Sequence, residues 1–268
     1  MPNTPRLRSR SGGFSASSRR HVDLDALVEG LIDELQASST PERAAGSKQY
    51  LKSDLDFIGA TMPALRKATR RLRRENPHLG RIEVLQLVEE LWRRPVFEMR
   101  AAGVEVLVAD VRLLGPVDMD LIERLLRESK TWALVDRLAA AVAGPLVERL
   151  PELGEVLDAW ASDEDFWIRR SSMLALLNQL RAGGGDFDRF SRYADGMLEE
   201  KEFFIRKAIG WVLRDTSRKR PELVATWVGP RTHRMSGVTI REAVKNLPPE
   251  QKASFLTAYK EKRPAVLP

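Results

Sequence analysis

One short hydrophobic and polar pattern recurs along the chain. An aliphatic residue, usually followed by Arg, precedes a polar or small residue and then a small one, early in a stretch with helical apolar spacing. Its copies are Leu65-Arg66-Lys67-Ala68, Met99-Arg100-Ala101-Ala102, Ile168-Arg169-Arg170-Ser171, Ile205-Arg206-Lys207-Ala208 and Ile240-Arg241-Glu242-Ala243. Three Arg intervals are 34, 37 and 35 residues, and the remaining one, 69, is twice that period. The missing copy is expected near position 135, where Leu134-Val135-Asp136-Arg137 falls in register with Val135 in place of the Arg.

A period of about 35 residues built only from helical segments predicts an all-α solenoid, in which each helix pair buries its apolar face against its neighbours. Within 203–214, the apolar positions keep the spacing of one helix with a wide buried stripe. The companion helices are expected at Ile82 to Trp92, Met119 to Leu126, Glu152 to Trp160, Phe187 to Met197 and Pro221 to Val228. We therefore expect a right-handed α-solenoid of about six HEAT-like repeats over residues 23–268, with one concave face.

The composition supports this class and narrows the chemistry. The chain is 43% hydrophobic, enough for a core, and its three Tyr and few β-branched runs argue against a large sheet. Without Cys and with only three scattered His, no metal site is expected. Gly183-Gly184-Gly185 lacks the Lys-Ser/Thr of a phosphate-binding loop, and no cofactor is expected. No apolar run approaches the roughly 20 residues of a membrane span, so we expect no membrane partner and a cytoplasmic location.

The net charge of +6 is concentrated at the amino end. Residues 1–20 hold five Arg and no acid, and removing these five from the 44 basic residues leaves 39 against 38 acidic ones. The segment 1–22 is therefore expected to be a disordered basic tail. A nucleic-acid surface on the body of the protein would have to arise from segregated charge.

The residue after each repeated Arg supplies such segregation. The Arg itself is interpreted as structural, bonding to carbonyls or acids of the neighbouring repeat. The next column reads Lys67, Ala101, Asp136, Arg170, Lys207 and Glu242, which a solenoid would present on one wall. Basic residues around a single Asp136 are the pattern expected of a phosphate-lined groove with one functional carboxylate.

Three Trp accompany these charges at helical spacing. Trp132 lies four residues before Asp136, and Trp211 four after Lys207. Trp167 similarly precedes Arg170 by three. Two interpretations stay open for each Trp taken alone, because Trp at helical spacing is more often a core residue than a site residue.

Taken together, these segments resemble the AlkD family of DNA alkylation repair glycosylases, from about Tyr50 to Asn246. The stretch 201–214 is similar to the family's signature helix, 132–136 to its Trp-x-x-x-Asp motif and 167–170 to its Trp-x-x-Arg motif. Segments 50–52 and 59–63 resemble the first repeat, although Thr61 stands where Gln is common. The resemblance implies that Asp136 is the catalytic carboxylate, that Trp132 and Trp211 contact the sugar and backbone of the damaged nucleotide, and that Arg170 holds phosphate.

The function implied is excision of cationic N3- or N7-alkylated purines from duplex DNA in base excision repair, by a nucleoid-associated monomer. Further DNA contacts are expected from Lys207, Lys67, Arg206, Arg241, Tyr50, Thr61 and Trp167. Two alternatives remain because a helical-repeat fold does not fix an activity. One is a non-catalytic DNA-binding solenoid, and the other is a protein scaffold whose concave wall binds an acidic peptide.

Overall fold

The computed structural model describes residues 23–261, which form a row of helices. The α-helices are α1 (Leu24–Ala37), α2 (Pro41–Leu51), α3 (Met62–Glu75), α4 (Arg81–Arg93), α5 (Phe97–Ala109), α6 (Met119–Glu128), α7 (Trp132–Leu138), α8 (Gly144–Arg149), α9 (Gly154–Trp160), α10 (Phe166–Ala175), α11 (Leu177–Ala182), α12 (Phe187–Met197), α13 (Phe203–Thr216), α14 (Pro221–Val228), α15 (Gly237–Ala243) and α16 (Pro249–Glu261). Short helical turns follow at η1 (Val111–Leu113), η2 (Pro116–Asp118), η4 (Pro151–Leu153) and η5 (Gly229–Arg231), and η3 (Ala139–Ala143) is a π-helical segment joining α7 to α8. Within 23–261, the sole β feature is an isolated bridge between Asp56 and Val96.

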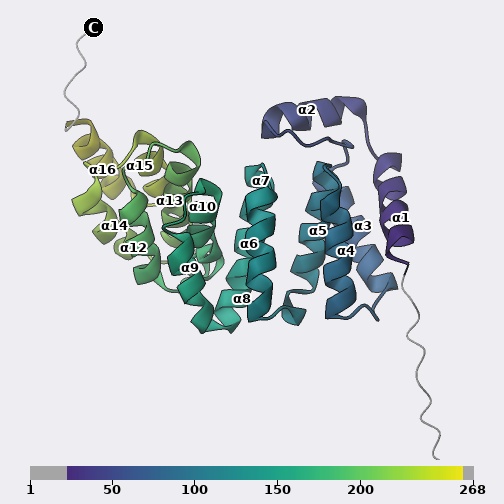
Figure 1. Ribbon diagram of the computed structural model, residues 1–268. Helices are drawn as coiled ribbons and strands as arrows, with labels where there is room; N and C mark the ends of the chain where they lie inside the picture. Colours follow the sequence, from purple (N-terminus) through teal and green to yellow (C-terminus); the bar gives the residue numbers. More distant parts are fainter. Residues whose placement is uncertain (1–22, 262–268) are drawn as a thin grey trace, which may run out of the picture.

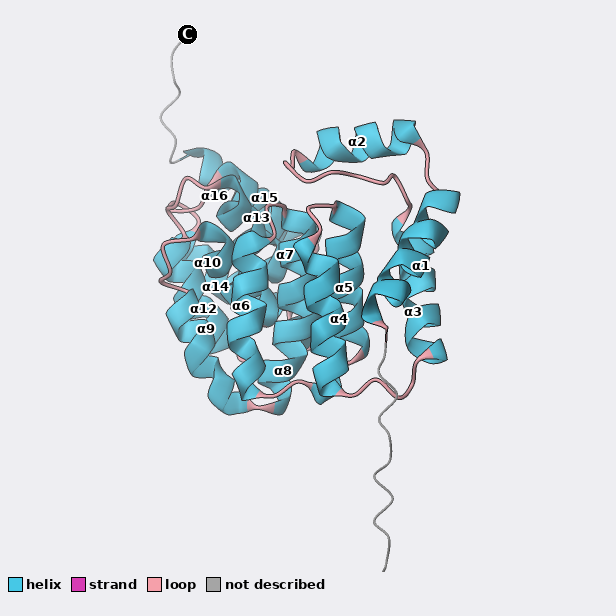
Figure 2. Ribbon diagram, turned by 45° about the vertical axis from the view of Figure 1, so that its right-hand side comes forward, coloured by secondary structure: helices cyan, strands magenta, loops and turns pink. Residues whose placement is uncertain are grey.

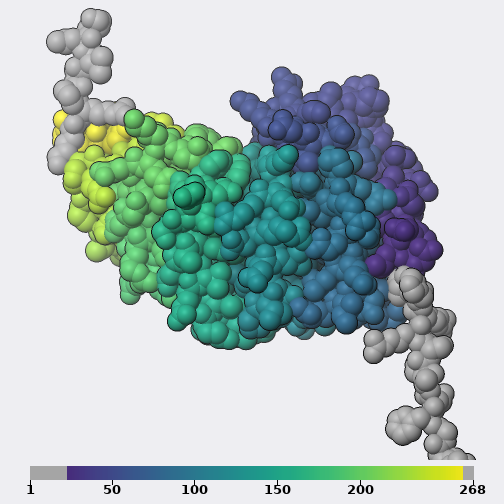
Figure 3. All heavy atoms as spheres, in the orientation of Figure 1, coloured from purple at the N-terminus to yellow at the C-terminus, as the bar shows by residue number. Residues whose placement is uncertain are grey.

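The helices stack in chain order from α1 at one end to α16 at the other (Figures 1 and 3). The predicted companion helices correspond to α4, α6, α9, α12 and α14, with ends shifted by a few residues at most. The expected all-α stack of helix pairs is thus confirmed. Helix α2 departs from the row, because it lies across the upper ends of its neighbours in both ribbon views (Figures 1 and 2). No residue of α2 is buried, and the same is true of α16 at the far end, whereas each of the other α-helices buries at least one residue.

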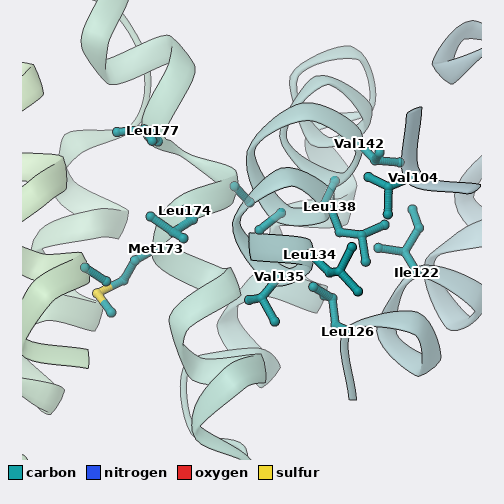
Figure 4. Close-up of a cluster of buried hydrophobic side chains, with 14 of the residues drawn as sticks. Val104, Ile122, Leu126, Leu134, Val135, Leu138, Val142, Met173, Leu174 and Leu177 are labelled. Atoms are coloured by element: carbon teal, nitrogen blue, oxygen red, sulfur yellow. The ribbon is translucent and has the colours of Figure 1, made fainter. Parts of the chain in front are cut away.

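The core runs through the stack as one continuous apolar cluster. On α7, Leu134, Val135 and Leu138 lie within it, beside Ile122 and Val104 of the preceding repeats (Figure 4). Val135, which stands where the repeat would place an Arg, is fully buried. The departure from the pattern therefore exchanges a connecting cation for a core side chain.

Three of the five repeated Arg residues connect neighbouring repeats, as the sequence predicted, whereas Arg206 donates to the carbonyl oxygen of Glu200, six residues before it. The Nε of Arg66 donates to Glu105 Oε1 at 3.0 Å, and Nη1 of Arg100 donates to the carbonyl oxygen of Glu128 at 2.6 Å. Arg169 makes two hydrogen bonds to the carboxylate of Glu200, at 3.0 and 2.9 Å. These contacts align successive inner helices and so place the residues that follow each Arg.

Helices α13 and α15 approach closely at Gly210. A Cβ there would lie 2.6 Å from Glu242 Cβ and 2.9 Å from the carbonyl oxygen of Thr239, so a larger residue would force the helices apart. This contact brings Glu242 within reach of Lys207 on α13, 2.7 Å between Oε1 and Nζ.

Two expectations concern the ends of the chain and membranes. The predicted basic tail, 1–22, lies outside the described residues. Among the helices of 23–261, none combines the length and the apolar character that crossing a membrane would need.

Candidate active site

The amino ends of α7, α10 and α13, together with the end of α2, enclose a cleft of about 590 Å³. Seven of the residues singled out from the sequence line it: Tyr50, Trp132, Asp136, Trp167, Arg170, Lys207 and Trp211. We call it the Asp136 cleft. Three neighbouring repeats and one out-of-row helix thus converge on a single hollow.

Capping carboxylates fix where two of these helices begin. Asp165 Oδ1 accepts a hydrogen bond from the backbone N–H of Trp167 at 2.8 Å, and Glu202 Oε1 accepts one from Phe204 N–H at 3.1 Å. Such caps satisfy amide donors that the first turn leaves free, and their charge complements the helix dipole. Asp165 therefore caps α10 and fixes its first turn.

Asp136 and Arg170 form a two-bonded ion pair between α7 and α10. Nε of Arg170 donates to Oδ1 at 2.7 Å and Nη2 donates to Oδ2 at 2.9 Å, while Nη1 donates to the carbonyl oxygen of Phe204. The Arg170 side chain is 3% exposed and that of Asp136 is 13% exposed. The carboxylate is thus held firmly yet keeps an edge open to the cleft.

Burial raises the pKa of Asp136 above the ordinary range of an aspartate, and the Arg170 guanidinium only partly opposes this rise. The raised pKa means that the charged form gains less from its surroundings than it would from water. A positive charge arriving in the cleft would therefore be favoured beside this carboxylate.

Three Trp rings, those of Trp132, Trp167 and Trp211, line the cleft and are only partly buried. The ring of Tyr50 meets that of Trp132 edge to face, with centroids 5.8 Å apart, and Tyr50 itself is 71% exposed. The indole N–H of Trp211 donates to Asp215 Oδ2 at 3.0 Å, and Arg181 also binds that carboxylate. Asp215 therefore sets the orientation of the Trp211 ring, whose centroid lies 6.0 Å from the guanidinium carbon of Arg170.

The remaining cations and polar residues named from the sequence are dispersed. Thr61 caps α3 and lines a neighbouring cleft of about 620 Å³, which contains Glu105 and which we call the Glu105 cleft. Arg206 and Arg241 line a separate polar hollow with Arg234. Lys67 is exposed on α3 and is not among the described residues lining the Asp136 or Glu105 cleft.

Sequence reasoning assigned no role to several residues at the cleft. Lys52, Lys130, Thr131 and Phe204 line it, and Asp215 holds Trp211. Asp215 had a detectable signal, since it follows Trp211 by four residues on the same helix face. Lys130 had none, because it stands in the connection before α7, where no periodicity indicates its direction. Within 23–261, no cluster of three or more His, Asp or Glu could hold a metal ion.

Comparison with known proteins places most of the helical row in one family. The profile of a family described as DNA alkylation repair enzyme matches residues 31–247. A solved structure described as a predicted DNA alkylation repair enzyme from Enterococcus faecalis superposes with a TM-score of 0.71 at 23% identity, covering 79% of this chain and 98% of that one. The crystal structure of AlkD2 from Streptococcus mutans gives 0.61 at 13% identity, covering 84% and 99%. A search among curated proteins gave no match.

Proposed function

The chain belongs to the DNA alkylation repair enzyme family, and from that premise we propose that it is a DNA glycosylase that excises cationic N3- or N7-alkylated purines from duplex DNA. One observation carries the proposal: an ionisable carboxylate, Asp136, is fixed in a cleft wall between Trp132 and Trp211. The cleft is complete within one chain, so a monomer suffices.

The proposed reaction needs a fixed negative charge more than it needs an acid. Alkylation at N3 of adenine or N7 of guanine makes the base cationic, and it leaves as a neutral purine with the electrons of the N-glycosidic bond. Positive charge then develops on the deoxyribose, where a preorganised carboxylate stabilises it. Water adds to C1′ and gives up its proton, which Asp136 can accept as general base.

The neighbouring side chains support this role of Asp136. Two bonds from Arg170 hold both carboxylate oxygens, so little reorganisation is required when charge develops. The flat faces of Trp132 and Trp211 offer negative electrostatic potential to a cationic sugar or base. Selectivity would then follow leaving-group reactivity, and neutral lesions would be poor substrates.

Binding to the duplex would depend on cations outside the catalytic pair. Lys207, Lys67, Arg206 and Arg241 are candidates for phosphate contacts. Lys207 lines the Asp136 cleft with Tyr50 and Trp167, Thr61 lines the Glu105 cleft, and the other three cations lie outside both, so any phosphates that those three contact would lie away from the damaged nucleotide. The buried Arg170 already spends three of its donor contacts on Asp136 and on the carbonyl oxygen of Phe204. We therefore assign Arg170 first to positioning Asp136.

The decisive test compares Asp136→Asn with Glu105→Gln on methylated duplex DNA. Both substitutions neutralise a mostly buried carboxylate bound to Arg, but only Asp136 lies in the proposed site. We expect Asp136→Asn to slow release of 7-methylguanine by about 100- to 1000-fold, the usual effect of losing one preorganised electrostatic group. Glu105→Gln should retain release.

Binding is measured in parallel, by fluorescence anisotropy on a duplex carrying an abasic-site analogue. Asp136→Asn should still bind, since its phosphate-binding cations are intact. Equal release by Asp136→Asn and wild type would refute the mechanism. Tight binding by a wild-type protein that releases no base would favour the non-catalytic DNA-binding alternative, and absence of duplex binding at low salt would favour the peptide scaffold.

A further inference from the structure

Two lysines at the Asp136 cleft share an uncommon backbone conformation. Lys52, which ends α2, has φ 48°, and Lys130, in the connection before α7, has φ 52°. Within 23–261, they are the non-glycine residues with positive φ, and both line this cleft. Glycine is the residue that adopts this region without steric penalty, so a lysine is an unexpected choice at either position.

A second local cost lies beside Lys130. The hydroxyl of Thr131 is buried and has no hydrogen-bond partner among the described residues. Thr131 also stands at the start of α7 without making the side-chain cap that this residue type usually provides. Backbone strain and an unsatisfied polar group in one short segment indicate a sequence retained for something other than stability.

The charged side chains that line the cleft all have ion-pair partners except at these two residues. Asp136 is paired with Arg170, and Lys207 is paired with Glu242 at 2.7 Å. Lys52 and Lys130 are exposed, and neither side chain has an ion pair or hydrogen bond within the described part of the chain. The unpaired positive charge in the lining of the cleft therefore belongs to the lysine that caps the end of α2 and to one in the segment preceding Trp132.

We propose that Lys52 and Lys130 form a phosphate clamp, which grips the phosphodiester backbone beside the nucleotide whose sugar faces Asp136. Lys130 and Trp132 are two residues apart, so a sugar against the indole would have its own phosphates within reach of that ammonium. Lys52 offers a second cation from the out-of-row helix α2. This inference rests on the proposed function, because it takes the ligand to be a DNA strand.

The left-handed conformation allows an unusual test with glycine. In Lys52→Gly and Lys130→Gly, the charge is lost while the backbone strain is relieved, so the melting temperature should stay equal to or rise above that of wild type. Affinity for a duplex with an abasic-site analogue should fall. In anisotropy titrations between about 50 and 200 mM salt, the log–log slope should become shallower by about 0.9 for each lysine removed, and by about 1.8 in the double variant.

Two controls separate charge from backbone effects. Lys219 is exposed beyond the far end of α13, with ordinary negative φ, so Lys219→Gly should lower the melting temperature and leave binding unchanged. Lys52→Arg and Lys130→Arg keep the charge and the strain, and should bind as wild type does. Lysines with only a structural role would not give weaker binding at an unchanged or higher melting temperature in the glycine variants together with wild-type binding in the arginine variants.

The outcomes distinguish the clamp from the proposed function itself. If wild type releases 7-methylguanine while both glycine variants bind with its affinity and salt slope, the clamp is refuted and the glycosylase proposal stands. If the glycine variants lose melting temperature as Lys219→Gly does, the lysines serve the fold, which also refutes the clamp. If wild type binds duplex but releases no base, and the glycine variants show the expected shallower salt slopes, the clamp holds and the glycosylase proposal fails.

Discussion

Two neighbouring clefts in the same wall contain carboxylates held by arginine, yet the two carboxylates differ in their electrostatic environment. Glu105, in one cleft, accepts hydrogen bonds from Arg66 and Arg137, three in all at 2.9 to 3.0 Å. Asp136, in the other, is held by Arg170 alone among residues 23–261. Tyr50 and Trp132 line both clefts and divide them.

Burial and the number of neighbouring cations together decide how each carboxyl titrates. Burial raises the pKa of both, but in Glu105 the hydrogen bonds and charges of Arg137 and Arg66 outweigh it and the pKa falls below its usual value. In Asp136 burial outweighs the single Arg170 and the pKa is raised. Both carboxylates bridge inner helices. Glu105, bound by two Arg, is suited to a structural role, whereas Asp136, bound by one, is suited to a catalytic role.

Removing Arg170 should have the largest effect on this contrast. Arg170→Ala leaves the mostly buried Asp136 carboxylate without its partner, which destabilises a protein by about 3–5 kcal/mol. We expect to measure that loss by chemical denaturation at neutral pH. The Asp136 carboxyl is fully ionised in the unfolded chain at that pH, so folding of the variant must bury a carboxylate without its partner. The control is Arg169→Ala, whose Glu200 pair is more exposed and should cost less. Equal losses in the free energy of unfolding would mean that burial does not make the Asp136–Arg170 pair more important for stability than the Arg169–Glu200 pair.

The pH dependence of base release provides the second test. Release requires ionised Asp136, so its rate should fall about tenfold for each pH unit below the pKa of that group. Because this pKa is raised, the acid limb should begin above 3.8, the ordinary value of an aspartate. A single-turnover profile measures it, and Glu105→Gln should follow the same curve. If the acid limb shifted in Glu105→Gln, the group whose ionisation limits release would lie in the Glu105 cleft, and Asp136 would not be that group.

Glu105→Gln should have a smaller effect, and on stability alone. Losing the charge in a buried set of charge-assisted hydrogen bonds is expected to lower the free energy of unfolding by about 1.5–3 kcal/mol at neutral pH. Since the folded-state pKa of Glu105 is lowered, its stabilisation is fully present above 4.5 and is lost as the pH falls through that lowered pKa. Denaturation curves of variant and wild type should therefore converge in acid. A difference that persisted there would indicate lost packing.

The sequence was sufficient for the stack of helices because the repeat and the apolar spacing are local signals. It also placed Asp136, Arg170 and Lys207 on a common wall, since each stands two residues after its repeat's aliphatic residue, and it placed three Trp beside them by their helical spacing. The hydrogen-bond and ion-pair partners of these residues could not be predicted from the sequence. Whether Arg170 binds phosphate or Asp136 depends on the separation of two helices 34 residues apart in sequence, which no local pattern contains.

The same limit explains the dispersed cations. Arg206 and Arg241 share the repeat position of Arg169, and that position faces the connections between helices, away from the Asp136 cleft. Lys52 and Lys130 enter the cleft through left-handed backbone at a helix end and in a connection. Such positions follow from turn geometry and from tertiary packing, so periodicity cannot predict them.

The smallest effect should come from the Trp211 ring, which can be compared with a structural Trp. Trp211→Phe keeps a flat face but loses the N–H that Asp215 accepts, and phenyl offers a weaker π face to a cation. Release of 7-methylguanine should slow by about two- to fivefold, or about 0.5–1 kcal/mol of barrier. Trp160 is buried on α9 and donates to Glu123 at 2.8 Å, so Trp160→Phe should lower stability and leave release unchanged. If both variants released base at the wild-type rate, the indole of Trp211 would not stabilise the transition state. The Asp136 carboxylate would then provide that stabilisation without it.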